Sequence, residues 1–167
     1  GANLTGATII SADLSGANLK GANLKGADVS PFSLKGANLS GAKLKGANLA
    51  PSLTGGITGK PQSLPAGWIL RSGYLIGPGA SLDSEDLSGE DLRAVDMSGA
   101  NLTDADFFQV GLDGIDRIAI VNAETNLNDA FLVGATLSKL QGSGISAKRT
   151  IFIGADLKGA NLSECKC

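Results

Sequence analysis

Two pairs of reactive side chains stand out in this sequence, which contains no histidine. Glu85 and Glu90 lie five residues apart, and Cys165 and Cys167 belong to the tripeptide CKC. Paired carboxylates suit general acid–base catalysis, and paired thiolates bind metal ions or join in a disulfide. In the sequence, neither pair has a histidine, an activated nucleophile or a set of further metal ligands beside it. We therefore expect no enzyme activity and no cofactor.

Both pairs lie within a five-residue repeat, which is clearest in GANLKGANLKGADV at residues 16–29. A large aliphatic residue marks the centre of each unit from Leu4 to Leu49, and Ala stands two residues earlier in nine of these ten units. Neither a straight helix nor a straight strand brings these residues to one side, so the chain must turn a corner in every unit. Glycine supplies the positive φ that a type II turn needs. Since one unit buries too little to fold alone, successive coils must stack about 4.8 Å apart.

Three segments carry a resemblance to a known family: GANLKGANLKGADV, SGANLTDADF from Ser98 and IGADLKGANLS from Ile153. They resemble the pentapeptide-repeat proteins, whose pattern is A(D/N)LXX. The resemblance implies an all-β fold, a right-handed quadrilateral β-helix with four five-residue units per coil. It also implies that the central residue and the residue two before it point inward. With 28 units in the sequence, about seven coils are expected.

We expect a single repeat domain over residues 1–167, interrupted once. The first run of repeats covers residues 1–50, an excursion covers 51–79, and the second run covers 80–167. Within the excursion, WIL and YLI flank Arg71-Ser72-Gly73 and predict a hairpin with a three-residue turn. Trp68 and Tyr74 could form an aromatic platform for a ligand. The interpretation that we favour is that they pack the excursion onto the side of the coil.

The second run keeps its phase from Leu82 to Cys167, with 18 central positions. Four central residues depart from the pattern: Arg117, Asn122, Gly142 and Ala147. The residues two before them are all large: Ile115, Ile120, Leu140 and Ile145. A gain of volume at one inward position offsets the loss at the other, as a packed interior requires. This compensation favours one unbroken helix of 18 units, although Arg117 and Asn122 could also mark a local bulge.

Glu85 and Glu90 occupy the position where Ala is usual. A buried, unpaired carboxylate costs several kcal/mol or takes up a proton. One interpretation is a catalytic pair. The other is that these corners open where the excursion rejoins the coil, with Arg71 or Arg93 nearby. The lack of a nucleophile, a histidine or a metal-ligand cluster favours the second.

Cys165 and Cys167 fall on two inward positions of one unit. We expect them to act as small side chains that fill the interior. A disulfide across a single residue is strained, and two thiols supply only half of a zinc site. The spacing alone does not decide whether the two are oxidised.

An apolar group points outward from the last coils. With twenty residues per coil, Phe131 should stack on Ile151 and Val133 on Ile153, while Phe108 points outward on the neighbouring face. Adjacent apolar side chains on a surface mark interfaces. We expect either a contact with a protein partner or second copy through this apolar face, or cover by a terminal segment absent from this sequence.

Charge is distributed unevenly along the chain. Residues 1–50 carry +3, residues 81–137 carry −10 and residues 138–167 carry +3, within a net charge of −2. The sequence predicts a non-enzymatic structural or protein–protein interaction module. The alternative is a DNA-mimicking inhibitor of a type II topoisomerase such as gyrase, because the resemblance implies that some family members match B-DNA in width and charge.

Three further expectations concern partners and location. The basic end, residues 1–50, has a single aromatic residue, Phe32, for base stacking, which argues against direct nucleic-acid binding. The sequence has no run of 18 apolar residues, so we expect no membrane span. No signal peptide is visible, and the compartment stays open.

Overall fold

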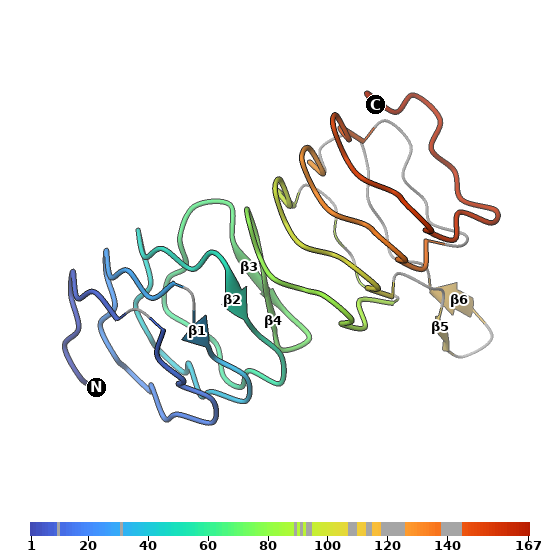
Figure 1. Ribbon diagram of the computed structural model, residues 1–167. Helices are drawn as coiled ribbons and strands as arrows, with labels where there is room; N and C mark the ends of the chain where they lie inside the picture. Colours follow the sequence, from blue (N-terminus) through green and yellow to red (C-terminus); the bar gives the residue numbers. More distant parts are fainter. Residues whose placement is uncertain are drawn as a thin grey trace. The chain divides into compact units, whose positions relative to one another are not determined.

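The computed structural model describes residues 1–9, 11–30, 32–88, 90, 92, 95–106, 110–112, 115–117, 126–137 and 145–167. The described chain winds in successive coils that are joined mostly by single backbone bridges rather than by long strands (Figure 1). It divides into two compact units, Gly1–Ile76 and Gly77–Cys167. We describe each unit separately.

In the first unit, parallel bridges join residues twenty positions apart. One row runs from Asn3 through Asn23 and Lys43 to Ser63. The backbone N–H of Leu4 donates to the carbonyl oxygen of Asn23 at 2.8 Å, and the same bond recurs around the coil. A spacing of twenty residues means four five-residue units per coil, so the predicted quadrilateral β-helix is confirmed. The total of about seven coils stays a prediction.

Each corner is closed by backbone geometry that the sequence predicted. Seven glycines of the first run have φ between 62° and 72°: Gly6, Gly16, Gly21, Gly26, Gly36, Gly41 and Gly46. The N–H of Ala7 donates to the carbonyl oxygen of Leu4 at 3.1 Å and so closes the turn around Gly6. The carboxylate of Asp13 accepts the N–H of Ser15 at 2.9 Å. Such bonds from the N–H two residues on explain the preference for Asn or Asp before the central residue.

The interior of the first unit consists of columns of leucine and alanine. Central residues such as Leu34, Leu39 and Leu44 are at most 1% exposed, and Ala37 and Ala42 are fully buried. Leucines of the first coil, including Leu4 and Leu19, are partly buried against this core. Full burial of a leucine contributes roughly 1.5–3 kcal/mol, so the stacked columns stabilise the coil.

The coil continues beyond the point at which the sequence pattern ends. Strand β1 (Phe32–Ser33) pairs in parallel with β2 (Ser52–Leu53), Asn38 bridges Thr58, and Lys43 bridges Ser63. The expected start of the excursion at residue 51 is therefore too early. Backbone bridges do not depend on side-chain type, so the chain keeps its place on the coil to about residue 64.

The predicted hairpin is present with a shorter turn than expected. Strand β3 (Ile69–Arg71) pairs antiparallel with β4 (Tyr74–Ile76), and Arg71 lies opposite Tyr74. The turn thus has two residues, Ser72 and Gly73, with φ of 45° and 85°. Positive φ at both positions is the signature of a type I′ turn, whose twist matches that of the strands. The expected three-residue turn is wrong because Arg71 belongs to the strand.

This hairpin rests on the first unit. The N–H of Ile57 donates to the carbonyl oxygen of Gly73 at 3.0 Å, and the N–H of Leu75 donates to Thr54 Oγ1 at 3.2 Å. Leu75 is 1% exposed and joins the core, while Leu70 and Trp68 pack against it. The hairpin therefore extends the core of the first unit.

The second unit changes its spacing once. Six rungs join residues twenty positions apart: Ser81–Asn101, Asp86–Asp106, Asn126–Ser146, Phe131–Ile151, Thr136–Asp156 and Ser146–Lys166. Three rungs between them join residues thirty positions apart: Asp96–Asn126, Asn101–Phe131 and Asp106–Thr136. The interval between Asp106 and Asn126 therefore holds ten residues more than a regular coil would place there. The expectation of one unbroken helix of 18 units is wrong, because an insertion of two whole units leaves the count in fives in phase.

A second hairpin lies within this insertion. Strand β5 (Val110–Leu112) pairs antiparallel with β6 (Ile115–Arg117), with Val110 opposite Arg117 (Figure 1). Arg117 thus belongs to a hairpin strand rather than to the centre of a coil unit. Of the two interpretations, the local interruption is the one that the structure supports.

Compensation of volume between inward positions is seen at one of the four departures. Ile145 is fully buried and Ala147 is 3% exposed, so the large and small side chains have exchanged places. Two other departures, Asn122 and Gly142, lie outside the described residues.

Candidate interaction surface

The predicted apolar stack is present on the outside of the second unit. Phe131 and Ile151 form a parallel bridge, and the N–H of Leu132 donates to the carbonyl oxygen of Ile151 at 2.8 Å. One step further along, the N–H of Gly134 donates to the carbonyl oxygen of Ile153 at 2.9 Å, which places Val133 and Ile153 on neighbouring coils. Backbone rungs thus hold all four apolar residues in register.

Exposure distinguishes these side chains from their buried neighbours. Phe131 is 45% exposed and Ile153 is 72% exposed, while Val133 and Ile151 are half-buried. Leu132, which lies between Phe131 and Val133 in the sequence, is only 1% exposed, because alternate residues of an extended segment face opposite sides. We call Phe131, Val133, Ile151 and Ile153 the apolar patch. Phe108, predicted for the neighbouring face, lies outside the described residues.

Acidic residues lie on the coils that come before the apolar patch. The row of backbone bridges that ends at Ile151 begins at Ser81, and the row that ends at Asp156 begins at Asp86. The first two rungs carry exposed or half-buried carboxylates, which we call the acidic corner: Asp83, Asp86, Asp104 and Asp106. Going along the unit, a partner would therefore meet two charged rungs and then two apolar rungs.

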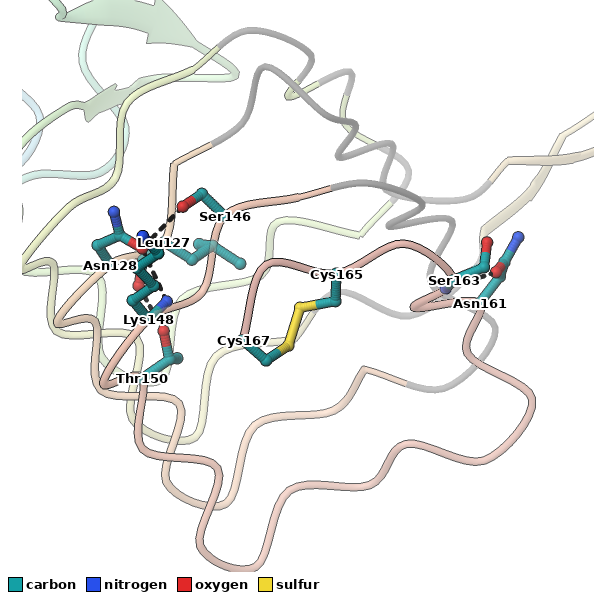
Figure 2. Close-up of a disulfide and its surroundings, with 9 residues drawn as sticks. All are labelled: Leu127, Asn128, Ser146, Lys148, Thr150, Asn161, Ser163, Cys165 and Cys167. Carbon is teal, nitrogen blue, oxygen red and sulfur yellow. Dashed lines mark hydrogen bonds between the residues drawn. A yellow bond between two sulfur atoms is a disulfide. The ribbon is translucent and has the colours of Figure 1, made fainter.

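The two cysteines are joined in a disulfide, a point that their spacing in the sequence had left open. Figure 2 shows the disulfide between Cys165 and Cys167, whose Cα atoms are 5.4 Å apart. Residues two positions apart in an extended segment point to the same side, which brings the two sulfur atoms together. Lys166 between them accepts the N–H of Ala147 at 3.2 Å and donates its own to Ile145 at 2.9 Å. The expectation that both residues fill the interior does not hold for Cys167, which is exposed.

The two inward glutamates keep ordinary corners. The N–H of Glu85 donates to the carbonyl oxygen of Leu82 at 3.3 Å, and that of Glu90 donates to Leu87 at 3.2 Å. These are the turn bonds of the other units, so the backbone does not open there as expected. Both side chains are half-buried. Among the described residues, no group of three or more potential ligands could hold a metal ion.

An ion pair that the sequence reasoning missed joins two coils of the second unit. Arg149 donates from Nε to Asp129 Oδ1 at 2.6 Å and from a terminal nitrogen to Oδ2 at 2.7 Å. This hydrogen bonding lowers the pKa of Asp129 and raises the pKa of Arg149. The separation of twenty residues was the available signal, because it places any two such residues on adjacent rungs.

Neighbouring side chains reinforce the same pair of coils. Asn128 Oδ1 accepts the Lys148 N–H at 2.7 Å and the Ser146 hydroxyl at 2.9 Å (Figure 2). The Thr150 hydroxyl donates to the carbonyl oxygen of Leu127 at 2.7 Å. Polar side chains thus tie together the coils that carry the apolar patch, which favours a rigid surface.

The aromatic residues of the first hairpin have structural surroundings. Trp68 packs against the core of the first unit, and Tyr74 begins strand β4. Both side chains are half-buried. The geometry favours the packing interpretation over the ligand platform. In the part of the chain that the structure describes, no helix is long and apolar enough to cross a membrane.

Comparisons with known proteins agree with the repeat geometry. The family model for pentapeptide repeats matches in eight copies, over residues 1–30, 33–50, 79–112 and 143–166. A search of curated proteins found no match. The unmatched segments include the first hairpin and residues 113–142.

Solved structures also show similarity. HetL, a pentapeptide repeat protein involved in heterocyst differentiation regulation from the cyanobacterium Nostoc sp. strain PCC 7120, is 26% identical with a TM-score of 0.34. That match covers 96% of this chain and 61% of HetL, so the chain spans less than two thirds of that protein. Full-length QnrB1, a plasmid-mediated fluoroquinolone resistance protein, is 16% identical over 96% of this chain and 84% of its own, with a TM-score of 0.31.

Proposed function

Because the family model matches more than half of its residues, the chain belongs to the pentapeptide-repeat family, and we propose that it is a non-enzymatic protein–protein interaction module. The observation that carries this proposal is the apolar patch. Phe131 and Ile153 are exposed, and Val133 and Ile151 are half-buried. The interior beneath them is already filled by Leu132, Ala130 and Ala135, each at most 1% exposed. The fold therefore does not need these side chains for its core.

Physical chemistry favours a protein contact at this patch. Each Å² of apolar surface removed from water contributes about 25 cal/mol, and large aromatic and aliphatic side chains supply most of that area. Because backbone rungs hold Phe131 above Ile151, little ordering is needed on binding. The partner is a protein with an apolar contact region, which includes a second copy of the chain.

Sedimentation velocity tests this proposal through self-association. Replacing Phe131 and Ile151 together by Ser should shift the protein to monomer while its thermal unfolding stays cooperative. Leu53→Ser is the matched control, since Leu53 is 44% exposed and belongs to the other compact unit. An identical sedimentation profile for the wild type and the double variant would argue against the patch as a contact surface.

A further inference from the structure

Five lysines gather on one side of the first unit. Lys20 and Lys60 lie at the same corner of the coil, two rungs apart. The backbone N–H of Gly21, next to Lys20, donates to the carbonyl oxygen of Ser40, and the N–H of Gly41, next to Ser40, donates to that of Lys60. The next corner carries Lys25 and Lys45 on adjacent rungs, and Lys43 lies in the row between the two corners. We call these five residues the lysine face. Lys43 is half-buried and the other four are exposed.

Within the described residues, no carboxylate pairs with these five lysines. Residues 1–76 contain only two acids, Asp13 and Asp28, and carry a net side-chain charge of +5. Asp13 accepts the N–H of Ser15 at 2.9 Å, and Asp28 accepts the Asn48 amide at 3.1 Å on other sides of the coil. The positive charge of the lysine face is therefore left for a partner.

A hollow follows the lysine face in the direction of the chain. It has a volume of about 510 Å³ and is lined by residues 59–64 together with Leu70, Ser72 and Gly73 of the hairpin. Pro61, Leu64 and Leu70 give it an apolar part, and Lys60 lies at its edge. The first unit thus presents charged rungs and then an apolar hollow.

The second unit has the complementary order. The acidic corner occupies two rungs, and the apolar patch occupies the next two. Both ladders have the same spacing of about 4.8 Å between coils, since both are built from hydrogen-bonded backbone rungs. Charges carried on two such ladders can therefore meet rung by rung when the coils run in the same direction.

We propose that a second copy of this chain is the partner, and that its acidic corner and apolar patch dock on the lysine face and the hollow. This inference rests on the proposed function and adds the surface that receives the patch. Residues 77–167 carry a net side-chain charge of −7, which opposes the +5 of residues 1–76. A nucleic acid or an anionic membrane would match the charge of the lysines but would leave the apolar hollow unfilled.

Charge reversal tests the two surfaces separately. In one variant, Lys25 and Lys45 become Glu; in the other, Asp83 and Asp86 become Lys. The fold should tolerate both variants, because the same positions of the five-residue repeat already carry Lys elsewhere. Asp83 and Lys45 each follow a central leucine, and Asp86 and Lys43 each precede one. Each variant alone brings like charges together, so its self-association should weaken by at least about tenfold.

Mixing the two variants provides the decisive measurement. The mixture contains one intact lysine face and one intact acidic corner on different chains, so association should return when the variants are combined. Sedimentation velocity with one variant fluorescently labelled would detect this. The matched control is Lys35→Glu, an exposed lysine on a different side of the same unit, which should not weaken association.

Three outcomes would overturn the inference: self-association of either variant that equals that of the wild type, a mixture that does not associate, or equal weakening by Lys35→Glu. Binding of duplex DNA or anionic vesicles that is lost in K25E/K45E, with self-association unchanged, would assign the lysine face to that ligand instead. If the variant with Ser at positions 131 and 151 loses association while both charge-reversal variants keep it, the proposed function stands and this docking surface is rejected. If K25E/K45E fails to fold, Lys25→Gln with Lys45→Gln repeats the test.

Discussion

At the scale of single residues, alternation along the chain decides what a partner can reach. Leu132 is 1% exposed, whereas Phe131 beside it is 45% exposed. The inward position is restricted by packing, and the outward position is restricted only by solvation. The outward residues therefore carry the information about partners, and the inward residues carry the information about the fold.

The Asp129–Arg149 pair is the clearest electrostatic feature at this scale. Its two hydrogen bonds cross from one coil to the next, and both side chains are exposed, at 49% and 74%. Surface ion pairs contribute little to stability. The pair should nevertheless be visible in the titration of its carboxylate.

We predict that Arg149→Gln raises the pKa of Asp129 toward its ordinary value of 3.8, because the lowering comes first from the Arg149 hydrogen bond. In the wild type, the folded-state pKa lies below the unfolded value. The pair therefore stabilises the folded protein above the unfolded pKa, and this contribution is lost as the pH falls through the folded pKa. NMR titration of the side-chain carboxyl carbons measures the change.

Asp13 is the internal control for this titration. Its pKa is also lowered, but by hydrogen bonds from Ser15, so Arg149→Gln should leave it unchanged. An Asp129 pKa that stays the same in the variant would show that the guanidinium does not hold it down.

At the scale of elements, the hairpin β3–β4 completes the core of the first unit. It contributes Leu75, at 1% exposure, and hydrogen bonds to Thr54 and Ile57 of the coil beneath it. Repeat proteins need terminal elements that cover the last hydrophobic layer. The hairpin serves as such a cover for the first unit.

We predict that Leu75→Ala destabilises the first unit by about 2–5 kcal/mol, the usual cost of removing a fully buried leucine. Urea unfolding followed by tryptophan fluorescence is the measurement. Trp68 is the only tryptophan in the chain and packs on this core, so its signal reports on the first unit.

Leu53→Ala is the matched control for the hairpin experiment. Leu53 is 44% exposed in strand β2, so its truncation should cost less than about 1 kcal/mol. Equal shifts of the urea midpoint in the two variants would contradict a covering role for the hairpin.

At the scale of the whole molecule, charge separates the candidate functions. Mimicry of DNA calls for negative charge that continues along the repeats. Residues 1–76 carry +5 instead, and only residues 77–167, at −7, have the sign that a mimic needs. An interaction module with two complementary surfaces accounts for both signs.

We therefore predict that the protein does not inhibit DNA supercoiling by gyrase at micromolar concentration, because its lysine face would repel the DNA-binding surface of that enzyme. A supercoiling assay with increasing protein measures this. Inhibition by the wild type that is lost in Asp83→Lys with Asp86→Lys would instead favour the mimic.

Much of the fold was predictable because its causes are local and repeated. Leucine and alanine at fixed positions of each unit predicted the inward columns, and glycine at the corner predicted the positive φ. The outward stack of Phe131 on Ile151 was predictable once the coil length was known. Phe108 could not be compared, because it lies outside the described residues.

The sequence by itself determined the five-residue unit, its inward residues and the outward direction of the apolar patch, because each follows from side-chain chemistry within a few residues. Only the tertiary structure decided which units stack on which. Residues 51–64 lost the pattern but kept their rungs, and the insertion before Asn126 kept the count in fives but added ten residues between rungs. Stacking is made by backbone hydrogen bonds between distant coils, and these bonds leave no mark on the residue types that form them.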